Sequence, residues 1–295
     1  MKTPLQYLRH LARSLFPGAA PAVWSMREAL LDLNRAAIKA DIRARHPQAL
    51  VLHGHKAYSQ CDEDGIIARI FELIGARSRV FVEAGCGDGI ENNTHHLLIQ
   101  GWRGAWIDGS ARNIDSICAQ LDYRPNPILS VTQAFITAEN VNDVVAAALR
   151  PIGVDAVPAE IDFLSLDIDG NELHVWNALQ ALRPRVLCVE YNARFAPPTE
   201  VSIGYAPQHQ YAGDDYQGAS LQSLVKAAEP RGYRLVACNI SGVNAFFVRE
   251  TDLPRHDWPA ISEIYMPPRY YLNVARPAFP GSLKFARDRL REAAR

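Results

Sequence analysis

The stretch VFVEAGCGDGIENNT, residues 80–94, decides the fold of this chain. An apolar run ends on Glu83 and is followed by Gly85, Gly87 and Gly89, so a buried strand gives way to a tight turn. Glycine at such a turn lets the backbone approach a ligand without a Cβ in the way. In a doubly wound sheet, ligands bind beyond the carboxyl ends of the strands. The stretch therefore predicts a ligand site on an α/β sheet.

The spacing of these glycines excludes the two common phosphate-binding loops. A dinucleotide fingerprint requires G-x-G-x-x-G, and Ile90 stands where the third glycine of that pattern would be. A Walker A loop requires Gly-Lys-Ser or Gly-Lys-Thr, and the chain contains neither triplet. NAD-dependent oxidoreduction is accordingly a remote alternative.

Composition and charge narrow the class of protein. The chain has 295 residues, 48% of them hydrophobic and 21% charged, which is enough to bury one sizeable core. Its net charge of −1 argues against a nucleic-acid partner. Its five cysteines are widely spaced and lack a C-x-x-C pair, as expected for reduced thiols in a cytoplasmic protein. No apolar run approaches the ~20 residues of a transmembrane segment.

From about residue 62 onward, short apolar strands alternate with helices, a pattern that predicts a parallel sheet covered on both faces. The last two strands are expected to pair as an antiparallel hairpin at the edge of the sheet. The fold class is therefore α/β, with a doubly wound, mostly parallel, seven-stranded and Rossmann-like sheet. The expected strands are residues 79–85, 104–110, 127–136, 161–170, 184–192, 233–241 and 244–250.

The rest of the chain is expected to form extensions and a lid. Residues 1–50 read as a helical extension, with one helix at 26–45 and an amphipathic N-terminus that packs on the body or a partner, or docks on a membrane surface. These helices are compatible with a homodimer. The core domain is expected at 51–253, with an ordered lid at about 193–220. Residues 254–295 form a C-terminal extension whose role the sequence does not indicate.

The second strand supplies an acid where an adenosine ligand would need one. Asp108 ends that strand, 19 residues after Gly89, and is expected to accept hydrogen bonds from both ribose hydroxyls. Glu83 is expected to face an ammonium group. A glycine turn between two acids suits a cationic ligand with an unphosphorylated ribose, and S-adenosylmethionine is the obvious candidate.

At this point the sequence resembles a known family. The segments VFVEAGCGDGIENNT, GWRGAWIDGS, FLSLDIDGNELHVWNAL, RVLCVEYN and GYRLVACNISGVNAFFV resemble class I S-adenosylmethionine-dependent methyltransferases of the FkbM type, from about Tyr58 to Val248. The family commonly carries Asp-Val-Glu-Gly at strand four, whereas this chain has DIDG at 167–170, which indicates a divergent branch. The resemblance implies O-methylation of a sugar, glycan or natural-product hydroxyl. It also implies that Gln60, in YSQCDEDG, closes over the cofactor.

The residues and the resemblance together give one set of candidate cofactor-binding positions. These are Gln60, Glu83, Gly85, Cys86, Gly87, Asp88, Asn93, Asp108 and Gly109.

Acids at the ends of the fourth and fifth strands form the candidate catalytic site. Asp167 and Asp169 are two residues apart, as are Glu190 and Asn192, so each pair shares one side of its strand. These four oxygen-bearing side chains suit Mg²⁺ or another divalent cation that would bind acceptor oxygens. The alternative is that the acids only cap the next helix and hydrogen-bond its loop. His174, on that helix, joins Asp167 and Asp169 as a candidate catalytic residue.

The acceptor is expected to be a small molecule or a glycan. Tyr205, Tyr211 and Tyr216 lie in the expected lid and offer polar aromatic surface on which sugars stack. Two alternatives stay open beside O-methylation. One is N-methylation of an amine or a peptide, which would need no metal. The other is a non-catalytic, cofactor-binding module that recruits partners.

Overall fold

The computed structural model describes residues 19–255, 258–273 and 280–294, and the chain divides into two compact units, residues 1–48 and 49–295. The first unit contains helix α2, Ala19–Arg45, which carries Arg43 and Arg45 in its last turn. Positive side chains there interact favourably with the helix dipole. The helix expected at 26–45 is part of this longer helix, which begins at Ala19. The expectations for the amphipathic N-terminus fall largely on residues outside the described part.

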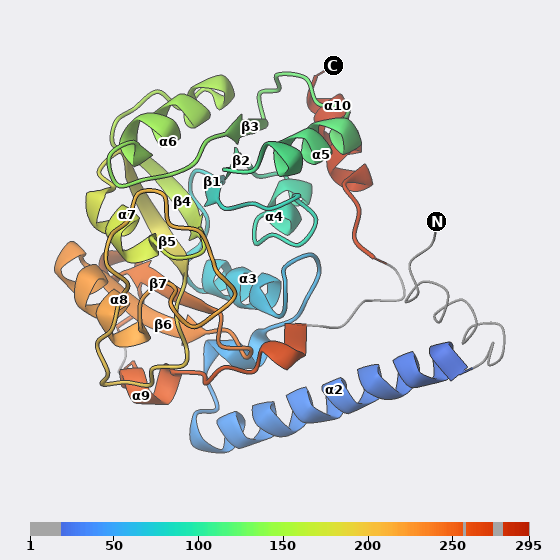
Figure 1. Ribbon diagram of the computed structural model, residues 1–295, viewed down its shortest axis with the longest axis vertical. Coiled ribbons are helices and arrows are strands. Elements are labelled where there is room, and N and C mark those ends of the chain that lie inside the picture. The colour runs from blue at the N-terminus through green and yellow to red at the C-terminus, as the bar shows by residue number, and fades with distance from the viewer. Residues whose placement is uncertain (1–18, 256–257, 274–279, 295) are drawn as a thin grey trace. The chain divides into compact units, whose positions relative to one another are not determined.

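A seven-stranded sheet forms the centre of the second unit, with the strand order β3-β2-β1-β4-β5-β7-β6 (Figure 1). The strands β1 to β5 pair in parallel, and β7 runs antiparallel to both β5 and β6. The predicted doubly wound, mostly parallel, seven-stranded Rossmann-like sheet with an antiparallel closing pair is confirmed. The strands are β1 (Val80–Ala84), β2 (Arg103–Asp108), β3 (Leu129–Gln133), β4 (Ala159–Leu166), β5 (Leu182–Glu190), β6 (Tyr233–Cys238) and β7 (Asn244–Arg249).

Helices flank the sheet, with α3, α4 and α5 on one side and α6, α7 and α8 on the other (Figure 1). Strand side chains between them are buried, and Phe81, Trp106 and Phe163 are completely inaccessible. Each such side chain contributes about 1.5–3 kcal/mol on burial. The helices are α3 (Glu63–Ile74), α4 (His95–Ile99), α5 (Ala111–Leu121), α6 (Val141–Leu149), α7 (Glu172–Ala178) and α8 (Leu221–Ala228).

The C-terminal segment continues past the sheet. It contains α9 (Ile261–Ile264), a short 3-10 turn at Tyr270–Asn273 and α10 (Lys284–Ala293), which packs on α4 and α5. Among the described residues, no helix is both long enough and apolar enough to cross a membrane.

The turn after β1 packs against the backbone at the exit of β4, and the contact is made at Gly85. Gly85 has φ +84°, and a Cβ built on it would lie 1.5 Å from the carbonyl oxygen of Asp167. The two segments are also bonded, since the Asp167 amide donates to the Ala84 carbonyl at 3.0 Å. Any side chain at position 85 would therefore force the ends of β1 and β4 apart.

Replacing Gly85 by alanine should strongly destabilise the fold. The clash is with backbone rather than with a flexible side chain, and the positive φ adds strain, so the loss in free energy of unfolding should be at least about 3 kcal/mol. Gly87→Ala is the matched control, because Gly87 also has a positive φ of +57° but has open space around its Cβ position. That variant should lose only about 1 kcal/mol. Urea unfolding curves measure both, and equal midpoints would contradict the role given to Gly85.

Candidate active site

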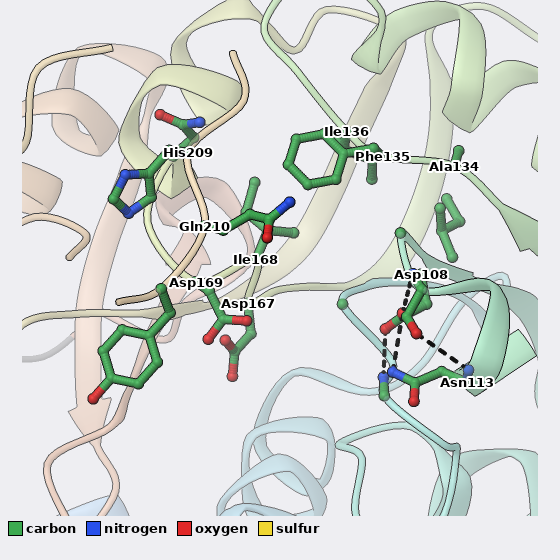
Figure 2. A pocket seen from close by; sticks show the side chains of 17 residues that line it. Asp108, Asn113, Ala134, Phe135, Ile136, Asp167, Ile168, Asp169, His209 and Gln210 are labelled. Atoms are coloured by element: carbon green, nitrogen blue, oxygen red, sulfur yellow. Dashed lines mark hydrogen bonds between the residues drawn. The ribbon is translucent and has the colours of Figure 1, made fainter. Parts of the chain in front are cut away.

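A pocket of about 600 Å³ opens at the carboxyl ends of β1, β2 and β4, where a doubly wound sheet binds its ligands (Figure 2). Strand ends, the loop after β3 and the lid (residues 193–220) all contribute to its walls. The lining residues are Gly85, Gly87, Ile107, Asp108, Gly109, Ser110, Asn113, Ala134, Phe135, Ile136, Asp167, Ile168, Asp169, Asn171, His209, Gln210 and Tyr211.

Asp108 holds the glycine turn in place from the end of β2. Its Oδ2 accepts a hydrogen bond from the Gly87 amide at 2.9 Å, and its Oδ1 accepts from the Ser110 amide at 2.8 Å and from Asn113 Nδ2 at 3.1 Å (Figure 2). Ser110 in turn caps α5 by accepting from the Asn113 amide. The carboxylate therefore fixes both the turn after β1 and the start of α5, and faces the pocket between them.

Glu83 is used differently, because it lies under the turn and not among the residues that line the pocket. It accepts hydrogen bonds from the amides of Asn93 and Thr94 and from the Thr94 hydroxyl. Burial raises the Glu83 pKa to about 7, although these three donors act in the opposite direction. Asn93 points its amide at Ser165 and Cys188, away from solvent. Both residues thus tie the 92–94 loop to the sheet.

The nine candidate cofactor residues therefore separate into two groups. Gly85, Gly87, Asp108 and Gly109 line the pocket, whereas the other five do not. Besides Glu83 and Asn93, these are Cys86, which is buried, Asp88, which accepts from the Ile90 amide, and Gln60, which accepts from Asn273 Nδ2.

Sequence reasoning missed the pocket residues that follow β3 and begin α5. Phe135 and Ile136 lie directly after the third strand, and Phe135 approaches Gly109 so closely that a Cβ there would be 3.0 Å from its ring. Both residues could have been predicted, because ligands bind beyond the carboxyl ends of the strands in such a sheet. Asn113 had no such signal, since it is one polar residue in the first turn of a helix.

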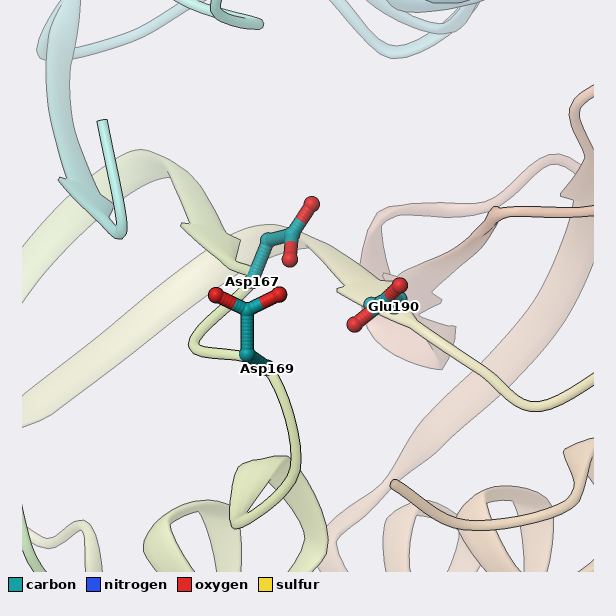
Figure 3. A group of neighbouring side chains, drawn as sticks. All are labelled: Asp167, Asp169 and Glu190. Atoms are coloured by element: carbon teal, nitrogen blue, oxygen red, sulfur yellow. The ribbon is translucent and has the colours of Figure 1, made fainter. Parts of the chain in front are cut away.

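Three acids meet beside the pocket and form what we call the acid cluster: Asp167, Asp169 and Glu190 (Figure 3). One carboxylate oxygen from each lies within 4.8 Å of the others. The parallel register of β4 and β5 pairs Leu166 with Val189, which sets Asp167 beside Glu190. Asp169 reaches the same place from a left-handed backbone conformation, φ +61°.

Crowding and burial change the acid–base properties of the cluster. Burial, followed by the negative charges of Glu172 and Asp169, raises the Asp167 pKa to about 8, although its hydrogen bond with Glu190 acts in the opposite direction. Burial and the neighbouring acids also hold the Glu190 pKa well above its ordinary value. The pKa of Asp169 is raised by burial and by Asp108. At neutral pH the cluster therefore retains at least one proton unless a cation replaces it.

Asn192, the fourth candidate metal ligand, is not part of the cluster. Its Nδ2 donates to the carbonyls of Asp215 and Gln217 at 2.9 and 3.0 Å, and its Oδ1 accepts from the Arg194 amide. These contacts all belong to the lid. The part of the chain that the structure describes therefore offers three carboxylates for a cation, a hard oxygen donor set that suits Mg²⁺ or Mn²⁺.

His174 also contacts the lid. Its Nε2 lies 2.9 Å from the Ile203 carbonyl oxygen and its ring lies 5.3 Å from that of Tyr205, so it is not among the pocket-lining residues. Further along the lid, the ring of His209 occupies the space that a Cβ on Gly170 would fill. The lid is thereby fixed over the exit of β4.

Comparison with known proteins adds little to this geometry. No protein-family model and no curated protein matches the chain. An S-adenosylmethionine-dependent methyltransferase from Clostridium acetobutylicum ATCC 824 is similar at 10% identity over 65% of this chain and 92% of its own, with a TM-score of 0.40. The N-terminal domain of EvdMO1 with SAH bound is similar at 14% identity over 72% of this chain and 94% of its own, with a TM-score of 0.40. The glycopeptide N-methyltransferase MtfA with sinefungin is similar at 12% identity over 66% of this chain and 88% of its own, with a TM-score of 0.37. The fold is therefore assigned from this chain's own strand order and register.

Removing one acid from the cluster should stabilise the protein at alkaline pH. The folded-state pKa of Asp167 lies near 8, above its ordinary value of 3.8, so stability is lost as pH rises between these values. Asp167→Asn abolishes this loss. In EDTA, its urea midpoint should exceed that of the wild type more at pH 8 than at pH 5. Asp115→Asn, an exposed change on α5, should show no such pH dependence. If the difference in urea midpoint between Asp167→Asn and the wild type were the same at pH 5 and pH 8, it would contradict the crowding of the cluster.

Proposed function

We propose that this chain is an S-adenosylmethionine-dependent methyltransferase that acts on a hydroxyl group of a sugar, glycan or natural product. The observation that carries the proposal is the arrangement of one pocket: a glycine turn and Asp108 on one side, and Asp167 and Asp169 on the other. One side suits an adenosine, and the other suits a cationic centre and a reacting hydroxyl. The five cysteines are all free thiols, which fits a cytoplasmic location.

The residues on the first side fit the adenosine part of the cofactor. Asp108 Oδ2 accepts one hydrogen bond from the protein, so it keeps a lone pair for a ribose hydroxyl. Phe135, which is 39% exposed, and Ile136 give an apolar surface of the kind that a flat adenine base contacts. At Gly85 and Gly87 the backbone itself forms the wall, because neither residue has a Cβ.

The second side fits the chemistry. When bound, the cofactor supplies an electrophilic methyl group on a sulfonium. Asp167 and Asp169 face the same crevice, where negative charge favours a cationic group. Once a cationic group replaces the proton that the cluster holds, the ionised Asp167 can accept a hydroxyl proton. His174 is proposed to act indirectly, because it holds the lid in place and does not line the pocket. His209, Gln210 and Tyr211 reduce the access of water to the crevice.

The acid cluster also fits a divalent cation. Asp167, Asp169 and Glu190 would hold the ion, which would supply positive charge that lowers the pKa of an acceptor hydroxyl. With the ion bound, the three acids would all be ionised. A protonated amine acceptor would satisfy the same charges without a metal, and this favours N-methylation as the second candidate. Methyl transfer that continues in EDTA would support the amine.

Loss of Asp108 should weaken cofactor binding. Isothermal titration with S-adenosylhomocysteine should show micromolar binding to the wild type and about 10- to 100-fold weaker binding to Asp108→Ala, because a hydrogen bond to a charged group is lost. Asp115→Ala, on the neighbouring helix, is the control and should bind like the wild type. If the wild type itself gave no heat, the methyltransferase proposal would fail and the alternative of a non-catalytic module would need another ligand.

Loss of Glu190 should weaken metal binding. Mn²⁺, followed by its electron paramagnetic resonance signal, should bind the wild type, and Glu190→Gln should reduce its affinity at least about tenfold, because one of three anionic ligands is lost. Glu200→Gln is the matched control, since Glu200 is a lid residue paired with Lys226 on the surface. Equal Mn²⁺ binding by both variants would remove the metal from the proposal and leave the methyltransferase itself standing.

A further inference from the structure

Helix α2, a single helix of 27 residues (Figure 1), carries a row of exposed apolar residues along one face. The side chains of Met26, Leu30 and Leu33 are 65%, 60% and 67% exposed. They follow one another at steps of four and three residues, and alanines continue the same steps toward the end of the helix. All six positions are exposed. We call this row the apolar seam: Met26, Leu30, Leu33, Ala37, Ala40 and Ala44.

The spacing of the seam is that of a helix that packs along a second helix. Alternating steps of four and three residues give a repeat of 3.5, which keeps the side chains on one side when two helices supercoil. Leu31 and Ile42 belong to another face of α2 and are buried. The seam is therefore a second apolar face of the same helix. Large apolar side chains gathered on one exposed face indicate an interface.

The sizes of the seam residues match a second copy of the same helix in the opposite direction. In an antiparallel pair centred between Leu33 and Ala37, each large side chain packs against an alanine of the second copy. Met26 faces Ala44, and the two leucines face Ala40 and Ala37. Every layer then contains one large and one small side chain, so the two helices stay at a constant distance. A parallel pair would crowd large side chains at one end and leave alanines facing alanines at the other.

The charges of α2 favour the same orientation. Residues 26–34 contain one base and two acids, whereas residues 35–45 contain four bases and one acid. An antiparallel pair places the acidic half of each helix beside the basic half of the other, where opposite charges attract. A parallel pair would bring the two basic halves together, where like charges repel. Side-chain size and charge therefore select the same partner in the same direction.

We propose that the chain forms a homodimer in which two copies of α2 pack antiparallel through the apolar seam. The paired stretch, residues 26–44, is about 28 Å long at 1.5 Å per residue. A contact of this length is smaller than a permanent interface, so monomer and dimer should exchange at micromolar concentrations. None of the seam residues lines the candidate active-site pocket, so the dimer stands independently of the proposed methyltransferase function.

Sedimentation velocity of the full chain between about 1 and about 200 µM tests the dimer. The wild type should pass from monomer to dimer over this range. Leu33→Lys should weaken the dimer at least about tenfold, because each dimer would bury two ammonium groups in place of two leucines. Leu30→Lys should do the same at a second seam position. Leu73→Lys is the matched control, since Leu73 is an exposed leucine of α3, and it should dimerise like the wild type.

Two results of this experiment would overturn the dimer. One is a wild type that stays monomeric at the highest concentration. The other is a pair of seam variants, Leu30→Lys and Leu33→Lys, that dimerise as well as the wild type. Both leucines are mostly exposed within the single chain, so lysine in their place should leave the fold of the monomer intact.

A distance between two spin labels tests the orientation. The label is attached at Arg45→Cys in a chain that carries Cys118→Ser, because the other four cysteines are buried. In the antiparallel pair Arg45 lies level with residue 25 of the second copy, so the labels should be more than about 30 Å apart. A parallel pair would place the labels level with each other, less than about 25 Å apart. The longer distance would support the proposed arrangement, and the shorter one would refute it.

Discussion

The contact between Gly85 and the Asp167 carbonyl is the constraint on which the pocket depends. Because position 85 has no Cβ, the turn after β1 and the exit of β4 share a space that no side chain could enter. Asp108 holds the same turn from the opposite side, through the Gly87 amide. The turn is thus anchored to both strands that flank β1. This anchoring brings the Asp108 and Asp167 carboxylates to opposite sides of one pocket, although 59 residues separate them.

The buried Glu83 and the half-buried Asp167 show how hydrogen-bond partners distinguish two acids whose pKa values are both raised. Glu83 and Asp167 both have raised pKa values, about 7 and about 8, and burial is the largest cause for each. Glu83 is surrounded by three donors from Asn93 and Thr94, which satisfy its charge and fix a loop. Asp167 has acids for neighbours instead, so its charge must be met by a proton, a cation or a ligand. Glu83 therefore fixes a loop, whereas Asp167 keeps a charge that its protein neighbours do not satisfy.

Much of the fold and part of the site follow from local sequence pattern. Strand periodicity and the glycine turn predict the sheet, and the ends of its strands predict Gly85, Asp108, Asp167 and Asp169, because strand ends converge by geometry alone. The exact partners of a carboxylate do not follow in this way. Glu83 and Asn192 were expected to face ligands, but each forms hydrogen bonds with main-chain groups of a later loop instead. Nor did any local pattern place residues 265–273, since the position of this segment depends on hydrogen bonds of Tyr265 and Met266 with residues just after β5, more than 70 residues earlier.

The order of the pocket's parts along the chain has a consequence for how such a protein diversifies. The turn after β1, Asp108 and the loop after β3 all precede residue 137, whereas the exit of β4 and the lid residues that line the pocket follow residue 166. One stretch of the polypeptide therefore builds the side that is proposed to hold an adenosine, and later stretches build the side that is proposed to receive an acceptor. Insertions or exchanges within the later stretches would alter what is recognised without disturbing the earlier ones.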